Sequence, residues 1–482
     1  MLALSIGIAL ALGWAGVRLF LGVDSLQPGW AARLMEVALG AGFGAGLTSS
    51  TFFLLLLAGA PGLWPVVSVE LILLLSAAGL LLRRARRRAP PAPLPEGQPA
   101  TGWNRLLALA LLAGTVLAGA AFFEAAGANP YGEWDAWSIW NVRAKFLAAP
   151  GDAWKYAYSP LLRTVHPDYP LLVSGFVARC WKYAGATPAS APLGAAFLFQ
   201  FAVVALLVSG VAVVRGASAG LLAGLVLLAS TNFLAQGASQ YADVPLSLYA
   251  AGSLGLLLVE AKMAPRRRAV LALAGLFAGF GAWTKNEGLL FLGLLAVSLL
   301  LVQGFVAGWK EAFRKCAWFL LGASPPLLLT LSFKLFMAPA ADPMLAQSVP
   351  KVLEKLRDAG RYVVVLKAFF TQALAQGEGW AQPVVLLAIL AIALRFEIGR
   401  RLRPAVTVAG LTLALLAAGY FGAYVVTPYD LRWHLGTSLG RLYAQIWPSF
   451  LLLSFSILRR PEDLALLPAP GKRKKKKRAR HG

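Results

Sequence analysis

The sequence predicts an all-α polytopic membrane protein with about 13 transmembrane helices. Of its 482 residues, 59% are hydrophobic and only 14% are charged, and the mean hydropathy is +0.68. Soluble domains average roughly 45–50% apolar and 25% charged residues. Apolar runs of about 17 to 22 residues, enough to cross a hydrocarbon core of roughly 30 Å, recur along almost the whole chain.

Each predicted span is one of these apolar runs. The first run lacks the basic segment and small-residue cleavage site of a signal peptide, so we expect a retained helix. The predicted spans are 2–23, 35–58, 63–82, 105–123, 193–214, 219–235, 243–260, 269–284, 288–306, 317–336, 382–395, 404–425 and 442–458.

Lysine and arginine clusters predict the orientation of the spans, because basic loops are retained on the cytoplasmic side. If each predicted span crosses the membrane once, all of the clusters fall on the same side, which is therefore the cytoplasmic one. The N-terminus then falls on the outer side. They are Arg83, Arg84, Arg86, Arg87 and Arg88; Arg266, Arg267 and Arg268; Lys310, Arg314 and Lys315; Arg400, Arg401 and Arg403; and the tail 471–480. The basic tail predicts attraction to anionic lipid at about 1 kcal/mol per charge, in preference to nucleic acid.

The chain divides into four expected parts. Residues 1–83 form an N-terminal three-helix unit, and 84–104 form a cytoplasmic linker rich in proline and arginine. Residues 105–458 form the main transmembrane domain, with a large external loop at 124–192. Residues 459–482 form a cytoplasmic polybasic tail.

Most of the remaining polar residues fall in external loops. Four of these loops, 124–192, 231–245, 284–287 and 426–441, combine a carboxylate or a cation with aromatic residues. This pattern predicts a site at the outer membrane face, whereas a transporter more often carries ionisable groups in mid-helix. A fifth loop, 337–380, has apolar residues at three- and four-residue spacing and predicts an amphipathic interfacial helix.

The stretch YGEWDAWSIWNVRAK, residues 131–145, places two carboxylates, three tryptophans and two cations close together. Drawn as an α-helix, it places Trp137, Trp140, Ala144 and Leu147 on one face and Asp135, Ser138, Asn141 and Lys145 over the other. Asp135 and Lys145 would lie about 15 Å apart along such a helix, so each needs a different partner. Tryptophans at a membrane boundary need no catalytic role, but a carboxylate there is costly unless it is used or paired.

The order of these features resembles the GT-C superfamily of integral-membrane glycosyltransferases, which includes protein O-mannosyltransferases and lipid A aminoarabinose transferases. The resemblance covers roughly residues 105–458. It rests on the acidic residue beside tryptophans in the first large loop, on TVHPDYPLL, where His166 stands in place of a family lysine, on WTKNEGLLF at 283–291 and on YDLRWHLGTSLGRL. The three leading helices depart from the usual family start.

The resemblance implies an inverting transfer of a sugar from a polyprenyl-phosphate donor to an unknown acceptor hydroxyl, in a bacterial cytoplasmic (inner) membrane with the site facing the periplasm. By position, Asp135 matches the family's catalytic base, with Glu133 as the nearby alternative. A phosphate leaving group needs cations instead of a general acid. The candidates are Lys285, Arg432 and Arg441, followed by Lys145 and His166; Asp168, Asp243, Glu287 and His434 are further site residues.

Several of these residues have simpler explanations. Asp243 would also serve as a helix N-cap, Glu287 as a partner of Lys285, Arg441 as an arginine snorkelling from a helix end, and His434 as a structural hydrogen-bonding residue. The family usually works without metal, and we expect no cofactor. A divalent cation held by Glu133, Asp135 and Asp243 is the alternative.

Three other functions are alternatives to this one. A flippase or transporter for a lipid-linked substrate would also be polytopic, but would carry charges in mid-membrane. An O-antigen ligase or polymerase would share the polyprenyl donor and differ in fold. A purely structural membrane subunit would leave the four polar loops unexplained.

Overall fold

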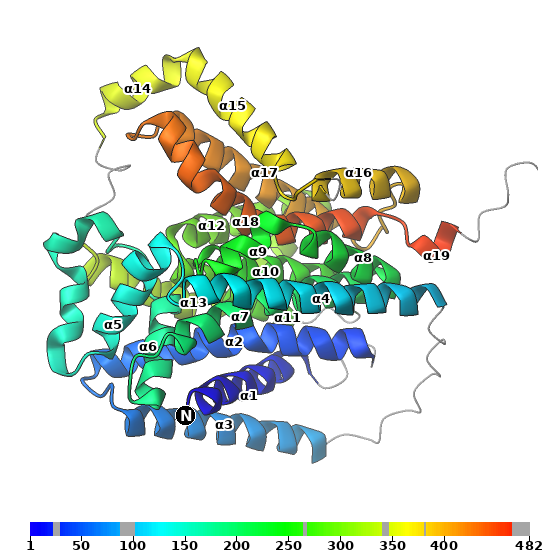
Figure 1. Ribbon diagram of the computed structural model, residues 1–482. Coiled ribbons are helices and arrows are strands. Elements are labelled where there is room, and N and C mark those ends of the chain that lie inside the picture. Colours follow the sequence, from blue (N-terminus) through cyan, green and yellow to red (C-terminus); the bar gives the residue numbers. More distant parts are fainter. Residues whose placement is uncertain (23–28, 87–101, 264–267, 340–346, 380–381, 465–482) are drawn as a thin grey trace, which may run out of the picture.

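The computed structural model describes residues 1–22, 29–86, 102–263, 268–339, 347–379 and 382–464. Every regular element in these segments is a helix, and the extended contact is limited to one bridge between Phe396 and Leu458. Long helices lie side by side in a bundle, and α14 (Val349–Arg357) and α15 (Ala359–Leu374) lie at one edge of it, with α15 packed on α17 (Arg403–Val425) and α18 (Leu431–Ile457) (Figure 1).

The helices divide into long spans and shorter connecting pieces. The α-helices are α1 Leu2–Leu21, α2 Trp30–Leu57, α3 Leu63–Arg86, α4 Gly102–Ala128, α5 Val142–Ala148, α6 Leu172–Ala184, α7 Ser190–Arg215, α8 Ala217–Leu228, α9 Thr231–Ala238, α10 Asp243–Lys262, α11 Arg268–Thr284, α12 Asn286–Ala307, α13 Trp309–Phe336, α14 Val349–Arg357, α15 Ala359–Leu374, α16 Pro383–Leu394, α17 Arg403–Val425, α18 Leu431–Ile457 and α19 Pro461–Leu464. A π-helix, η1 Ala136–Asn141, and two 3-10 helices, η2 Gly151–Tyr158 and η3 Pro160–Val165, complete the large loop.

Among the described residues, nine helices are long and apolar enough to cross a membrane: α1, α2, α3, α4, α7, α10, α12, α13 and α17. The chain is therefore a polytopic helical membrane protein, as the composition predicts. The total of 13 spans stays a prediction, because four of the expected spans fall short of this test. The expected span 219–235 is divided into α8 and α9 by a bend of 68°.

The other three expected spans fall short for reasons of length or polarity. With 17 and 12 residues, α11 and α16 would reach only about 25 and 18 Å. The fourth, 442–458, is the apolar half of α18, whose first half carries histidine and two arginines. Each of these segments is nevertheless helical where the sequence predicts a helix.

Close approach of backbones holds neighbouring helices together, as in many membrane proteins, where small residues line the interfaces. A Cβ atom added to Gly275 of α11 would lie 1.8 Å from the carbonyl oxygen of Phe319 in α13. A Cβ atom on Gly13 of α1 would lie 1.8 Å from the carbonyl oxygen of Gly40 in α2. Glycine is therefore required at both crossings.

The first three helices pack directly against the rest of the chain. Tyr249 of α10 donates a hydrogen bond to the carbonyl of Gly42 in α2 (2.9 Å), and Ser49 of α2 donates to the carbonyl of Leu172 at the start of α6 (2.7 Å). The expected linker 84–104 falls mostly on residues 87–101, which lie outside the described part, as does most of the expected tail.

A buried ion pair joins α3 to α6. Arg179 binds Glu70 through two hydrogen bonds of 2.6 Å each and also donates to the carbonyl of Ser5 in α1 (2.9 Å). Tyr183 donates a further hydrogen bond of 2.6 Å to Glu70. Both charged side chains are fully buried, so α1, α3 and α6 share one polar anchor.

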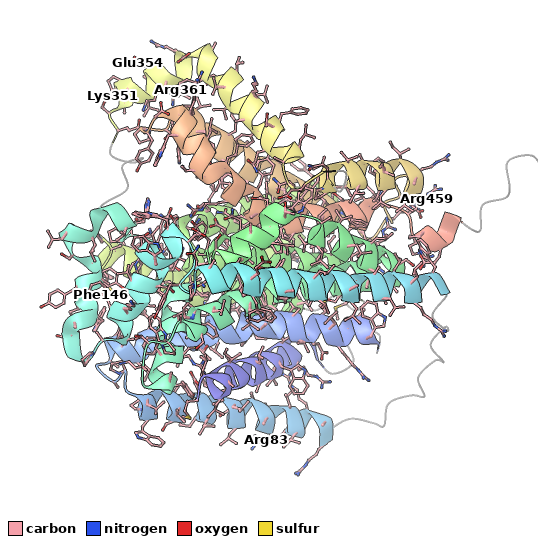
Figure 2. All side chains as sticks on the ribbon, in the orientation of Figure 1. Arg83, Phe146, Lys351, Glu354, Arg361 and Arg459 are labelled. Atoms are coloured by element: carbon pink, nitrogen blue, oxygen red, sulfur yellow. The ribbon has the colours of Figure 1, made fainter. Side chains whose placement is uncertain are left out.

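The helix ends fall into two groups. Arg83 and Arg459 lie at one end of the bundle, whereas Phe146, Lys351, Glu354 and Arg361 lie at the opposite end (Figure 2). Segments that the charge pattern assigns to opposite sides of a membrane therefore lie at opposite ends of the bundle. Their orientation in a membrane is a prediction from that charge pattern.

The loop predicted to hold an interfacial helix contains two helices, α14 and α15. The chain turns at Asp358, whose carboxylate accepts a hydrogen bond from the Gly360 N–H at the start of α15 (2.9 Å). Val363, Leu366 and Phe370 are exposed on α15. Exposed apolar residues of this kind are expected on an interfacial element.

Candidate functional site

A tight turn fixes the beginning of the large loop against the loop before α10. Gly132 has a φ of 77°, and a Cβ atom there would lie 2.5 Å from the carbonyl oxygen of Ser239. The Glu133 N–H donates to that same carbonyl (3.2 Å), and Gln240 donates to the carbonyl of Pro130 (3.0 Å). Residues just before Asp135 are thereby held beside residues just before α10.

Directly after Asp135 the chain forms the π-helix η1, and this corrects one expectation. Trp137 and Trp140, expected to share one face, differ in exposure, since Trp137 is 47% exposed and Trp140 is buried, and the polar residues Ser138 and Asn141, expected on a water-facing side, are buried. The expected pattern assumed α-helical spacing, whereas a π-helix closes i→i+5 hydrogen bonds and so changes the phase of its side chains. Asn141 uses its buried amide to donate to the carbonyl of Tyr131 (2.9 Å).

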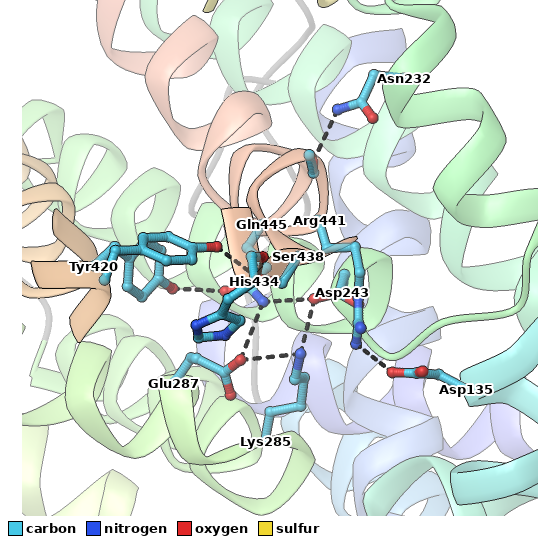
Figure 3. Close-up of polar contacts among 12 residues, drawn as sticks. Asp135, Asn232, Asp243, Lys285, Glu287, Tyr420, His434, Ser438, Arg441 and Gln445 are labelled. Atoms are coloured by element: carbon cyan, nitrogen blue, oxygen red, sulfur yellow. Dashed lines mark hydrogen bonds and ion pairs between the residues drawn. The ribbon is translucent and has the colours of Figure 1, made fainter. Parts of the chain in front are cut away.

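A buried layer of charge forms the base of the site (Figure 3). Asp243, at the start of α10, is 0% exposed and binds Lys285, which is 2% exposed, at 2.8 Å. Lys285 lies between α11 and α12 and also binds Glu287 at 3.0 Å. Gln445 of α18 donates to Asp243 (2.5 Å), and Tyr420 of α17 donates to Gln445 (2.6 Å).

Lys285 keeps its charge in this layer. Burial disfavours the ammonium, but Asp243 and Glu287 outweigh burial and raise the pKa of Lys285 above its ordinary value of 10.5. Asp243 makes no helix-capping hydrogen bond, since α10 has no side-chain cap. The carboxylate of Asp243 is therefore engaged by its ion pairs.

A more accessible ion pair lies on this layer. Arg441 of α18 binds Asp135 at 2.7 Å through Nη2 and Asp243 at 3.3 Å through Nε. Asp135 and Arg441 are 16% and 17% exposed and Glu287 is 20% exposed, so a ligand can reach these three members of the network, and Arg441 is the accessible cation among them. The Arg441 guanidinium also lies 4.8 Å from the centre of the Tyr241 ring. Arg441 is therefore an ion-pair partner of two carboxylates from distant segments.

The network has more negative than positive groups. Asp135, Asp243 and Glu287 carry three negative charges, and Lys285 and Arg441 carry two positive ones. In addition, Oε2 of Glu287 is buried and has no hydrogen-bond partner among the described residues. The cluster can therefore accept one further positive charge or proton.

The TVHPDYPLL segment adds a second polar group beside the first. Asp168 accepts hydrogen bonds from Asn286 (2.8 Å) and Lys334 of α13 (3.2 Å). Burial opposes ionisation of Asp168, but Asn286 and Lys334 outweigh burial and hold its pKa below the ordinary 3.8. Because Asn286 lies between Lys285 and Glu287 in the chain, the two polar groups are adjacent.

Stacked rings of the large loop lie next to these groups. Tyr169 stacks between His166, at 4.8 Å between ring centres, and Trp140, at 5.6 Å. The Lys285 ammonium lies 5.8 Å from the centre of the Tyr169 ring. Burial, followed by the charge of Glu287, raises the pKa of Tyr169 well above 10, so its hydroxyl stays protonated.

Five of the sequence-predicted site residues meet in the network, and Asp168 lies next to it. The others lie elsewhere. Glu133 is exposed and accepts a hydrogen bond from Asn129 (2.8 Å), and the Lys145 ammonium lies 5.3 Å from the centre of the Tyr131 ring. Arg432 is exposed at the start of α18.

The two histidine candidates have local contacts. His166 stacks on Tyr169, and His434 shares a hydrogen bond of 2.8 Å with the hydroxyl of Thr427. The contact of His434 agrees with its simpler explanation as a structural residue.

Sequence reasoning missed Gln445, Lys334, Tyr169 and Tyr420. Gln445 and Lys334 lie inside predicted spans, where their neighbours are apolar. One signal was present, because Gln445 follows Arg441 by four residues and so shares its helix face. Tyr420 and Tyr169 had no such signal.

Within the described segments, no group of three or more His, Cys, Asp or Glu side chains is arranged to hold a metal ion. Of the proposed ligand set, Asp135 and Asp243 are bridged by Arg441 and Glu133 binds Asn129, so the donors are engaged elsewhere. In comparisons with known proteins, the chain matches no family model, no curated protein and no solved structure.

Proposed function

We propose that the protein is an inverting glycosyltransferase that moves a sugar from a polyprenyl-phosphate donor to an acceptor hydroxyl. The observation that carries this proposal is the accessible Asp135–Arg441 pair over a buried Asp243–Lys285 layer. A carboxylate and a phosphate-binding cation are the two groups that such a transfer needs from the protein. The same order of loops resembles the GT-C superfamily.

The transfer is a single displacement. Asp135 takes the proton of the acceptor hydroxyl as its oxygen bonds to the anomeric carbon, and the bond from that carbon to the phosphate oxygen breaks. The electron pair leaves with polyprenyl phosphate. One displacement inverts the anomeric centre and needs no enzyme nucleophile, unlike the two-step route of retaining glycosidases.

Arg441 is the proposed ligand of the donor phosphate, because it is the accessible cation of the network. A phosphate oxygen that binds the guanidinium displaces the Asp135 carboxylate and so frees the base. Asp243 stays on Nε of Arg441 and keeps the guanidinium in place. Protonation of Asp135 then removes one negative charge from the cluster as the leaving phosphate gains one.

The remaining candidates have supporting roles in this proposal. Lys285 is buried beneath Arg441 and adds positive potential without a direct route to solvent. Lys145 and Arg432 are exposed cations available to a bound donor or acceptor. The lipid tail of the donor would bind through apolar burial between helices. The proposed location is a bacterial cytoplasmic membrane, with the site outside and the C-terminus inside.

A second candidate is a cation-coupled flippase or transporter for a lipid-linked substrate. The excess negative charge of the network and the unpartnered Oε2 of Glu287 favour it, because coupling ions and protons bind at such buried carboxylates. In this alternative, Glu287 gains a proton or a monovalent cation during each cycle.

The test is transfer of radiolabelled sugar from a panel of polyprenyl-phosphate sugars by the purified protein in proteoliposomes, with and without EDTA. We expect transfer that EDTA does not reduce, and a product whose anomeric configuration is opposite to that of the donor. Retained configuration would refute the single displacement. Ion-dependent movement of intact donor across the bilayer, without transfer, would favour the transporter.

A further inference from the structure

A hollow lies at the far end of α10 from the proposed active site. Asp243 begins α10 and Glu260 lies near its end, so the two are on the order of 25 Å apart along the helix. The hollow is formed by the ends of α10, α11 and α13, and is lined by Glu260, Arg268, Leu271, Glu311, Arg314, Lys315 and Trp318.

Two ion pairs within the hollow use most of its charges. Lys315 binds Glu260 at 3.3 Å, and Arg314 binds Glu311 through hydrogen bonds of 2.8 and 2.7 Å. Lys315 and Glu260 are buried, whereas Arg314 is exposed at the edge. Within the described lining, these pairs leave one cation without a carboxylate partner and one carboxylate oxygen without a hydrogen-bond partner.

The unmatched cation is Arg268, the first residue of α11. Its guanidinium lies 5.4 Å from the centre of the Trp318 ring and has no carboxylate partner among the described residues. The unmatched acceptor is Oε1 of Glu260, a residue only 3% exposed, and this atom has no hydrogen-bond partner in the described part of the chain. A buried carboxylate oxygen without a donor is costly and indicates a missing partner.

We propose that this hollow binds the headgroup of an ethanolamine phospholipid. The phosphate binds Arg268, with Arg314 beside it, and the ammonium donates a hydrogen bond to Oε1 of Glu260. Among the lining residues that the structure describes, three cations and two carboxylates sum to one positive charge, which suits the phosphate. A choline headgroup has no N–H to donate, and a glycerol headgroup has no positive charge for the carboxylate.

The position of the hollow suits a lipid better than a soluble phosphate ester. It lies at the ends of α10 and α13, which are both long and apolar enough to cross a membrane, and its lining includes Trp318. Aromatic residues of this kind gather at the level of lipid headgroups, where acyl chains begin.

The test is native mass spectrometry of the detergent-purified protein with added ethanolamine, choline or glycerol phospholipid of the same acyl chains. A charge-assisted hydrogen bond is worth about tenfold in affinity, so we expect about tenfold tighter binding of the ethanolamine lipid than of the choline lipid. Soluble phosphoethanolamine without acyl chains should bind far more weakly. Equal binding of the ethanolamine and choline lipids would overturn the proposal.

Variants test the phosphate contact and the ammonium contact separately. Arg268→Ala should weaken the ethanolamine and glycerol lipids alike, whereas Glu260→Gln should remove the preference between them. Arg268 is exposed, so its loss leaves folding intact even if Glu260→Gln destabilises the buried pair. Lys310→Ala, an exposed change on α13 outside the hollow, is the control and should bind as wild type. An Arg268→Ala protein with wild-type binding would overturn the phosphate contact.

Discussion

The buried Glu70–Arg179 pair offers the sharpest test of how the first three helices join the rest of the protein. Glu70→Gln keeps the size of the side chain but removes the charge opposite Arg179. The guanidinium would then be fully buried with one carbonyl, one amide oxygen and no carboxylate among its contacts. Breaking one side of a buried pair typically costs about 3–5 kcal/mol.

We expect the lower end of that range, about 3 kcal/mol, because the hydrogen bond from Arg179 to Ser5 remains. The double variant Glu70→Leu with Arg179→Met should lie within about 1 kcal/mol of wild type, since both charges leave together. The assay is equilibrium unfolding in mixed micelles, followed by the fluorescence of tryptophan. It gives the free energy of unfolding for each variant.

The Arg18–Glu36 pair provides the matched control, because its atoms are 3.6 Å apart and its side chains are 25% and 13% exposed. Glu36→Gln should cost less than about 1 kcal/mol. If Glu70→Gln destabilises no more than Glu36→Gln does, the anchor between α3 and α6 does not stabilise the fold and the reasoning fails.

Three further predictions concern the site and the packing. Arg441→Lys should reduce sugar transfer by about 100-fold, because one ammonium cannot span two carboxylates. The matched change Arg357→Lys, at an exposed position on α14 with no role in the proposal, should leave the rate unchanged. Asp168→Asn should lower the unfolding free energy by about 1 kcal/mol at neutral pH. Folding lowers the pKa of Asp168, so its ionised carboxylate stabilises the fold above pH 3.8. This stabilisation is lost as the pH falls through the lower pKa of the folded state. The unfolding free energies of wild type and variant should therefore converge at low pH in an acid titration. Gly275→Ala should cost about 2 kcal/mol by overpacking, whereas Gly293→Ala, where no atom lies within 4 Å of the added Cβ, should be neutral in the same unfolding assay.

Contrary outcomes are equally specific. Equal rates for the two arginine variants would remove Arg441 from the site. A stability difference at Asp168 that persists unchanged at low pH would assign its effect to packing instead of charge. Equal stability of the two glycine variants would mean that α11 and α13 move apart at little cost.

Much of the site could be predicted from the side of the membrane to which each loop is assigned. Asp135, Asp243, Lys285, Glu287 and Arg441 come from four loops that the basic clusters assign to one side of a membrane. Charges in short loops between long apolar helices have few other places to lie, so their convergence follows from topology. Their functional roles are the part that the proposed assays test.

Other features needed the three-dimensional structure. The π-helix after Asp135 has no signature in the hydrophobic pattern, so the prediction that Ser138 and Asn141 face water was wrong. Gln445 and Lys334 sit among apolar residues that hide them in any hydropathy profile. Bends such as the one between α8 and α9 depend on tertiary packing, which local sequence does not encode.

The most direct test of the central claim compares Asp135→Asn with Asp152→Asn in the sugar-transfer assay. Both change one aspartate to asparagine in the same large loop, but Asp152 is highly exposed and pairs only with Lys155 among the described residues. We predict that Asp135→Asn lowers the transfer rate by at least about 100-fold, the contribution expected of a general base, and that Asp152→Asn retains the wild-type rate. Transfer by Asp135→Asn at the rate of Asp152→Asn would contradict the account.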